Sequence, residues 1–212
     1  MEHSSLAEPD TLPKYLLQTA ARYGSKKVAM RKKELGIWRE YSWQESLDQV
    51  KYLTLGLLRL GLARGDKVAI LGENDPQYYW AELAVQAAGA AAVGIFTDCA
   101  PKEVRYIVDH CDASFVFAKD QEQCDKLLAI RDEIPRVKRV IYWDPKGLWN
   151  YSDPWLLAFD DVAAQGKEHQ AAQPGLFEQT AAQGQAADVG IFCYTSGTTG
   201  LPKGAMITHG NM

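Results

Sequence analysis

Hydroxyl residues, glycines and one lysine are concentrated in a single segment near the end of this 212-residue sequence. Residues 194–204 read Tyr-Thr-Ser-Gly-Thr-Thr-Gly-Leu-Pro-Lys-Gly and directly follow an apolar run that is typical of a buried strand. Glycines let a backbone approach a phosphate closely, so that successive N–H groups point at it. The hydroxyls add hydrogen-bond donors, and Lys203 adds a compact positive charge. The segment therefore predicts a cradle for a polyphosphate.

Two other interpretations of this segment compete with a phosphate cradle. The P-loop of NTPases needs a glycine before its lysine and a Ser or Thr after it. Lys203 stands between Pro202 and Gly204, which excludes that motif. The same residues could instead form a plain glycine-rich hairpin turn between strands at 191–194 and 205–207. The ordered series of hydroxyls, glycines and lysine favours the cradle.

The segment resembles the signature of the adenylate-forming superfamily, which contains acyl-CoA synthetases, luciferases and the adenylation domains of peptide synthetases. The similarity continues through residues 205–211, Ala-Met-Ile-Thr-His-Gly-Asn. Upstream, residues 65–74, the helix end at Gly89 and residues 100–104 are similar to the start of long-chain fatty acid:CoA ligases. The resemblance covers nearly the whole chain, from about residue 11 onward.

This resemblance implies an AMP-forming acid:CoA ligase of fatty acid metabolism. A carboxylic acid, with a long-chain fatty acid as the first choice, would react with ATP to form an acyl-adenylate. Coenzyme A would then displace AMP and form the thioester. Medium-chain, aryl and bile-type carboxylates stay open as alternative substrates. For the 212 residues alone, a catalytically incomplete nucleotide-phosphate-binding or structural module stays open as well.

The family's contacts to the ATP phosphates can be carried over to seven positions of this sequence. They are Thr195, Ser196, Gly197, Thr198, Thr199, Gly200 and Lys203. Thr195 is also a candidate ligand of the Mg²⁺ ion that accompanies ATP. Lys203 is expected to assist the departure of pyrophosphate electrostatically.

No catalytic residue is assigned within the sequence. In the family, the adenine-binding segment, the acidic Mg²⁺ ligand, the acyl pocket, the hinge and the catalytic lysine all lie downstream of the positions matched here. We therefore expect the N-terminal portion of the large domain of an adenylate-forming enzyme, truncated before the rest of that enzyme.

Two histidines are weaker candidates for a functional role. His209 follows Lys203 by six residues and matches a Thr-His pair of the family, so a contact with substrate is a hypothesis for it. His110, beside Cys111 at a helix end, is interpreted as a packed or capping residue. The four cysteines form no C-x-x-C pair, which argues against a zinc site or a redox dithiol. They are Cys99, Cys111, Cys124 and Cys193, and they are expected to be reduced and structural.

Composition and charge limit the class of protein. The sequence is 47% hydrophobic, as is typical of globular domains, and 27 acidic against 23 basic residues argue against a nucleic-acid partner. No secretory signal starts the sequence, and the longest uncharged stretch worth testing, residues 83–97, is too short to span a membrane. We expect a cytoplasmic enzyme whose partners are ATP, a fatty acid and CoA. Peripheral membrane contact and a homo-oligomer are compatible with this sequence.

Alternating strands and helices are expected to position the loop. The expected helices are 12–23, a long helix between the capping residue Ser42 and Gly61, 77–88, 101–111 and 120–134. The expected strands are 67–71, 91–96, 114–118, 137–143 and 188–194, with a separate hairpin of 27–31 and 37–41 around a five-residue turn. Such alternation predicts an α/β fold with a parallel or mixed sheet and crossover helices on both faces.

The composition divides the chain into three parts. Residues 1–162 are expected to form an N-terminal α/β subdomain of the AMP-binding domain. Residues 163–187 are interpreted as an Ala/Gln-rich connector with one short helix at 176–182. Residues 188–212 hold the strand, the phosphate loop and the start of a helix capped by Thr208. In the loop after residue 143, three aromatic residues are expected to pack together: Trp149, Tyr151 and Trp155.

Overall fold

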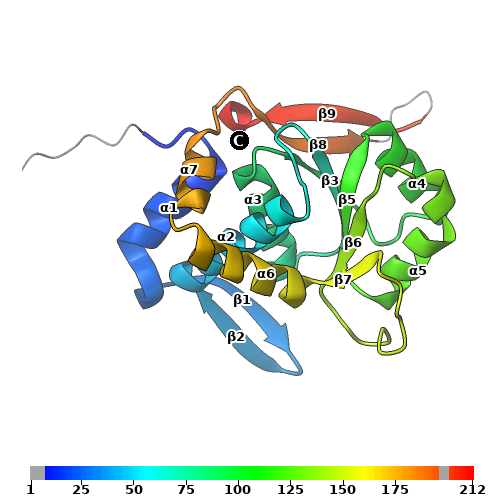
Figure 1. The fold of residues 1–212 in the computed structure, drawn as a ribbon, viewed down its shortest axis with the longest axis horizontal. Helices are drawn as coiled ribbons and strands as arrows, with labels where there is room; N and C mark the ends of the chain where they lie inside the picture. Colours follow the sequence, from blue (N-terminus) through cyan, green and yellow to red (C-terminus); the bar gives the residue numbers. More distant parts are fainter. Residues whose placement is uncertain (1–7, 196–200) are drawn as a thin grey trace, which may run out of the picture.

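A mostly parallel sheet runs through the centre of the molecule (Figure 1). The computed structural model describes residues 8–195 and 201–212. Within these residues the sheet has seven strands, which lie side by side in the order β7 (Leu156–Ala158), β6 (Arg139–Tyr142), β5 (Ala113–Ala118), β3 (Lys67–Leu71), β4 (Ala91–Ile95), β8 (Val189–Thr195) and β9 (Lys203–Thr208). Neighbouring strands are parallel except β8 and β9, which form an antiparallel hairpin.

Helices cover both faces of this sheet (Figure 1). One face carries α1 (Leu12–Tyr23), α2 (Trp43–Arg59), α3 (Pro76–Ala87), α6 (Phe159–Ala172) and α7 (Leu176–Ala182), and the other carries α4 (Pro101–His110) and α5 (Gln121–Ala129). Side chains of a strand alternate between faces. Phe115 and Phe117 of β5 accordingly enter the first core, whereas Val116 enters the second. The expected α/β fold with crossover helices is confirmed.

Local signals explain where the helices begin. The Ser42 hydroxyl accepts a hydrogen bond from the Glu45 N–H at 3.2 Å, and the Glu45 carboxylate accepts one from the Ser42 N–H at 2.7 Å. This capping box satisfies two backbone donors at the start of α2, as predicted. Asp75 stands at the N-cap of α3 without a side-chain capping hydrogen bond, and Pro76 lies in the first turn, where a missing N–H costs nothing.

The small antiparallel hairpin of β1 (Val28–Glu34) and β2 (Ile37–Ser42) stands apart from the central sheet (Figure 1). The hairpin itself was predicted, but the expected five-residue turn is wrong. Strand pairing continues to Glu34 and Ile37, so only Leu35 and Gly36 form the turn. Both have positive φ, as type I′ turns require.

The first part of the predicted connector is also wrong, because residues 163–172 continue α6. The Ala/Gln-rich composition with Pro174 and three glycines favoured a connector, but the role of one of these glycines, Gly166, is to let two helices approach. A Cβ at Gly166 would overlap the carbonyl oxygen of Tyr52 in α2, and a Cβ at Gly56 of α2 would overlap the carbonyl oxygen of Val162. The predicted short helix at 176–182 is present as α7. The division into three parts stays a prediction.

Two of the three aromatics after β6 are packed as expected. Trp155 is 4% exposed and its Nε1–H donates to the Val137 carbonyl at 2.9 Å. The Tyr151 hydroxyl donates to an Asp125 carboxylate oxygen at 2.7 Å. Trp149 is 80% exposed, so its inclusion in the cluster was wrong. A short strand, β7, follows this loop and was not predicted.

In the part of the chain that the structure describes, no helix combines the length and apolar character that crossing a bilayer requires.

Candidate functional site

The predicted phosphate loop joins the two strands of the β8–β9 hairpin. Thr195 and Lys203 are direct partners in the register of this hairpin, and both are exposed. The other predicted phosphate contacts lie outside the described residues: Ser196, Gly197, Thr198, Thr199 and Gly200. The hairpin that was considered as an alternative is thus present, and it brings the first and last predicted contacts to one end. The two interpretations are therefore compatible.

This end of the hairpin lies at the carboxyl edge of the parallel strands. Ile191 and Phe192 of β8 pair with Ala92 and Val93 of β4, so both strands point the same way and end at the same edge. In open α/β sheets, ligands bind in crevices outside the carboxyl ends of the strands. The sheet therefore places the loop where a ligand site is expected.

A cavity of about 720 Å³ opens at the same edge. Its lining includes Gly72 after β3, Ile95 of β4, Cys193 and Tyr194 of β8, and Tyr78 and Glu82 of α3. Burial raises the pKa of the Glu82 carboxyl, and it raises the pKa of the Tyr78 hydroxyl to about 12. The volume falls in the range of small-molecule sites, which are mostly apolar with few polar groups.

Lysines from the neighbouring elements hold the loops around this cavity. Lys119, after β5, pairs with Glu73, after β3, at 2.5 Å, and this hydrogen bond raises the pKa of Lys119. Lys126 of α5 donates to the Thr97 carbonyl, after β4, at 2.5 Å. The loops that follow β3 and β4 are thereby tied to β5 and α5.

Tyr106 and His110 of α4 contact both ends of the phosphate loop. The Tyr106 hydroxyl donates to the Pro202 carbonyl at 3.0 Å, and His110 Nδ1 lies 2.6 Å from the Tyr194 hydroxyl. The His110 ring stacks on Tyr106, with centroids 5.2 Å apart, and meets Tyr194 edge-on at 5.7 Å. Burial raises the pKa of Tyr194 to about 12. We call Tyr106, His110 and Tyr194 the aromatic clamp.

The aromatic clamp was not recognised in the sequence. His110, interpreted as a packed or capping residue, is instead exposed, and the contact of its ring with a loop-flanking tyrosine was missed. The four-residue spacing of Tyr106 and His110 on one predicted helix was the available signal, since residues so spaced share a helix face.

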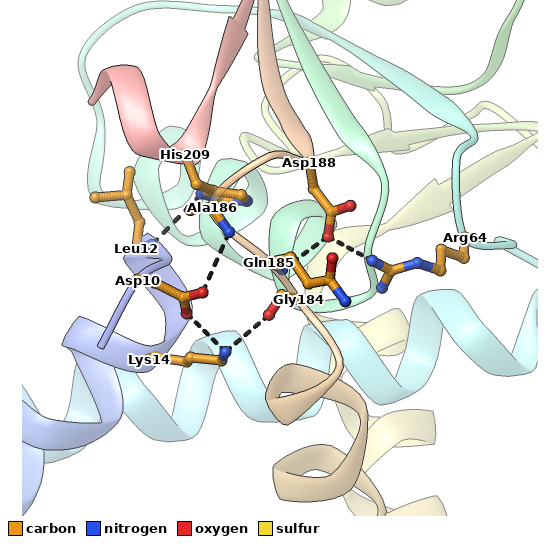
Figure 2. Close-up of polar contacts among 9 residues, drawn as sticks. All are labelled: Asp10, Leu12, Lys14, Arg64, Gly184, Gln185, Ala186, Asp188 and His209. Atoms are coloured by element: carbon orange, nitrogen blue, oxygen red, sulfur yellow. Dashed lines mark hydrogen bonds and ion pairs between the residues drawn. The ribbon is translucent and has the colours of Figure 1, made fainter. Parts of the chain in front are cut away.

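At its other end the hairpin is anchored to α1 (Figure 2). The Asp10 carboxylate accepts from the Ala186 N–H at 3.2 Å and from Lys14 Nζ at 2.7 Å. Lys14 Nζ also donates to the Gly184 carbonyl at 2.7 Å. The segment before β8 is therefore fixed to the first turn of α1.

His209 and Asp188 close the base of the hairpin (Figure 2). The His209 N–H donates to the Asp188 carbonyl at 3.0 Å, and His209 Nδ1 accepts from the Leu12 N–H at 3.5 Å. The Asp188 side chain pairs with Arg64 and accepts from the Gln185 N–H. His209 is 8% exposed and lies at the opposite end of β9 from Lys203. Because His209 is buried and far from the phosphate loop, the structure does not support the predicted contact of His209 with substrate.

The buried position of His209 predicts a pH-dependent stability. Burial, the largest cause, lowers its pKa from the ordinary value of 6.5; of the charged groups that face it, Lys14 also lowers this pKa, whereas Asp188 and Asp10 raise it. The unfolded chain then binds the proton more readily, so the free energy of unfolding should fall as pH drops below about 6.5. Urea unfolding at several pH values checks this. His209→Asn should flatten the slope and His169→Asn should keep it; equal slopes in all three proteins would contradict the assignment.

The cysteines differ in accessibility. Cys111 and Cys124 are buried, and burial raises the pKa of their thiols to about 11 and about 12, so thiolates are scarce at neutral pH. Cys193 is exposed on β8 and lines the cavity. Over residues 8–195 and 201–212, no group of three His, Cys, Asp or Glu side chains could hold a metal ion.

Comparisons with known proteins give consistent similarities. The family described as "AMP-binding enzyme" matches residues 16–212. The long-chain-fatty-acid–CoA ligase ACSBG2 of Xenopus laevis is 29% identical over 214 residues, which cover 100% of this chain and 28% of that protein. The long-chain-fatty-acid–CoA ligase ACSBG1 of Homo sapiens is 27% identical over 207 residues, which cover 96% of this chain and 27% of that protein.

A solved structure is similar over the same length. The anthranilate CoA ligase AuaEII, in complex with anthranoyl-AMP, has a TM-score of 0.76 at 25% identity, and the match covers 99% of this chain and 36% of that one. The chain thus spans little more than a quarter of the length of the curated relatives it matches.

Proposed function

The chain belongs to the AMP-binding enzyme family, which matches residues 16–212, and from that premise we propose that the protein is an AMP-forming acid:CoA ligase. Its substrate class is long-chain fatty acids, a choice supported by relatives named long-chain-fatty-acid–CoA ligases over the whole chain. The observation that carries the proposal is the position of Thr195 and Lys203, paired across the hairpin at the carboxyl edge of the sheet.

The proposed reaction has two steps that balance without a further reactant. A carboxylate oxygen of the acid attacks the α-phosphorus of ATP, and the bond to the bridging oxygen breaks, releasing pyrophosphate. The thiolate of CoA then attacks the carbonyl carbon of the acyl-adenylate, and AMP leaves. Negative charge accumulates on the departing pyrophosphate in the first step, so cationic and N–H donors held there lower the barrier.

The loop supplies those donors in this proposal. The residues that bind the β- and γ-phosphates are Thr195, Ser196, Gly197, Thr198, Thr199, Gly200 and Lys203. Lys203 has no carboxylate partner among the described residues, which leaves its ammonium group available for phosphate oxygens. The Thr195 hydroxyl is a hard oxygen ligand of the kind that Mg²⁺ accepts, and the ion would supply further positive charge to the triphosphate. Each charge-assisted hydrogen bond contributes roughly 1.5–3 kcal/mol.

The proposal extends to the cellular compartment of the protein and to its assembly. Four unpaired cysteines support a reducing, cytoplasmic location. Small molecules, namely ATP, the fatty acid and CoA, are the proposed substrates, with peripheral contact at membranes into which long-chain acids partition. A homo-oligomer is compatible with the proposal. The proposal also keeps the division into residues 1–162, 163–187 and 188–212, with residues 163–172 as the end of α6 and not as a linker.

Aryl carboxylates are a second candidate substrate class. The similarity to an anthranilate CoA ligase covers 99% of this chain at 25% identity, which supports including aromatic acids in the substrate panel.

ATP–pyrophosphate exchange on the complete protein tests the proposal. Radioactive pyrophosphate should enter ATP when a long-chain fatty acid is present, and little exchange should occur with short acids. If exchange depended on an aryl acid instead, the proposed long-chain substrate would be wrong, but the proposed adenylation reaction would stand. No exchange with any acid in a panel of long-chain, medium-chain, aryl and bile-type carboxylates would leave only a binding or structural module.

The aromatic clamp gives a separate prediction for this function. Tyr106→Phe removes the hydroxyl that donates to Pro202, at a cost of about 1 kcal/mol for a hydrogen bond. We expect kcat/KM for ATP to fall about fivefold, with a fall of the thermal midpoint of about 2–4 °C. Tyr15→Phe, at a tyrosine of α1 that is 50% exposed, is the matched control. Equal activity of both variants would contradict a role of the clamp in positioning the loop.

A further inference from the structure

The tip of the β1–β2 hairpin exposes large apolar side chains. Leu35 is 103% exposed, Ile37 75% and Trp38 60%. In Figure 1 this hairpin projects from the body of the molecule, at the opposite end of the view from β9. Three large apolar residues at one projecting turn are not needed for the core, since none of them packs into either buried cluster. Exposed apolar groups of this kind mark interaction sites.

The turn also adopts a conformation that its first residue disfavours. Leu35 has φ of 47°, in the left-handed region where Asn or Gly is usual in a type I′ turn. Its side chain recovers none of that cost by packing, because it is fully exposed. Residues that break a local rule without a gain in folding are expected at functional sites.

The segment that contains the hairpin carries an excess of positive charge. Residues 26–42 contain two acidic side chains and six basic ones, a local net charge of +4 within a chain of −4: Lys26, Lys27, Arg31, Lys32, Lys33 and Arg39. Arg31 pairs with Glu40, and Lys32 pairs with Glu34 and Asp75. Of the hairpin's other cations, Lys33 lies over the Trp38 ring at 5.9 Å and Arg39 over the Tyr41 ring at 4.9 Å.

The apolar and cationic groups occupy both faces of the hairpin. Directly opposed residues share a face. Trp38 and Lys33 are therefore on one face, whereas Ile37 and Arg39 are on the other, with Arg39 two pairs further from the turn than Ile37. The tip is a wedge with apolar residues at its end and cations on both sides. Trp and Leu with flanking Lys and Arg are the residues that bind at the boundary of lipid headgroups and acyl chains.

We propose that this hairpin tip docks the protein on an anionic lipid bilayer, with Leu35, Ile37 and Trp38 among the headgroups and the cations against lipid phosphates. The reason for such docking rests on the proposed function, because the long-chain fatty acid that would be the substrate partitions into bilayers. A protein partner fits less well: stable interfaces bury about 800 Å² on each side, and a convex tip of three side chains offers less. Anionic lipid complements the local charge of this region.

Vesicle sedimentation of the complete protein without ATP or CoA tests the docking. The wild type should pellet with phosphatidylcholine vesicles that contain phosphatidylglycerol, and less with phosphatidylcholine alone. Leu35→Asn, which installs a residue that the turn prefers, and Trp38→Ser should each lower the partition coefficient about fivefold. Trp149→Ser is the matched control, since Trp149 is 80% exposed outside the hairpin, and it should pellet like the wild type.

Three results would overturn the docking proposal. They are equal sedimentation of the wild type with neutral and anionic vesicles, equal losses for Trp149→Ser and Trp38→Ser, and a concentration-dependent dimer that Leu35→Asn abolishes without any vesicle binding. Pyrophosphate exchange with a detergent-dispersed acid separates this proposal from the ligase activity. Leu35→Asn should leave that exchange unchanged. If the protein bound vesicles but catalysed no pyrophosphate exchange, the ligase proposal would be refuted and the docking proposal would stand.

Discussion

Lys203→Ala in the complete protein is expected to lower kcat/KM for ATP by about 10²–10³-fold. Lys203 is exposed at the end of β9, opposite Thr195, and lies outside both buried cores. In the proposed reaction its removal therefore takes a positive charge from the departing pyrophosphate, and it takes no packing from the fold. Steady-state kinetics with varied ATP, together with a thermal melt, measure both effects.

The control for this variant is Lys146→Ala, at a lysine whose side chain is 84% exposed in the loop after β6. It should retain full activity. If Lys203→Ala lowered the melting temperature and the activity together, the lysine would be structural, and the assignment of the phosphate loop would lose its main cation.

Gly166→Ala is expected to destabilise the fold by about 3 kcal/mol or more, because no space exists for a methyl group between α6 and α2. A Cβ there would overlap the backbone carbonyl of Tyr52, which cannot move without shifting α2. In an isolated helix the same change would be stabilising by about 1 kcal/mol, so tertiary packing reverses the sign. Urea unfolding of the two proteins measures the difference.

Gly184→Ala is the matched control for this prediction. A Cβ at Gly184 would meet only ordinary contacts, and its φ is not in the left-handed region. Its effect should stay within about 0.5 kcal/mol. A stabilising effect of Gly166→Ala would mean that α6 does not lie against α2 as described.

The success of the sequence-based predictions depended on how far apart the interacting residues are. The capping box of Ser42 and Glu45 involves neighbours, so its physics is complete within a few residues. The prediction that failed at 163–172 rested on an Ala/Gln-rich composition with Pro174 and three glycines. The role of one of them, Gly166, is set by Tyr52, more than a hundred residues away. Alone, a glycine in an Ala/Gln-rich segment reads as a helix breaker.

The candidate site shows the same division. The order of hydroxyls, glycines and lysine in residues 194–204 was sufficient to predict a phosphate loop and to indicate the family, because that chemistry is carried by adjacent residues. The aromatic clamp joins Tyr106 and His110 to residues 96 and 84 positions later. No local pattern encodes such a contact, since it depends on α4 packing beside the β8–β9 hairpin.

The amino-acid order by itself determined the alternation of strands and helices, the capping box of α2, and the series of hydroxyls, glycines and lysine that we propose to bind a nucleotide's phosphates. Tertiary structure decided that Thr195 and Lys203 meet at one edge of the sheet, that His209 is a buried anchor, and that Leu35 and Trp38 face solvent. The physical reason is range: backbone preferences and capping act over a few residues, whereas burial and sheet register depend on segments far apart in the sequence.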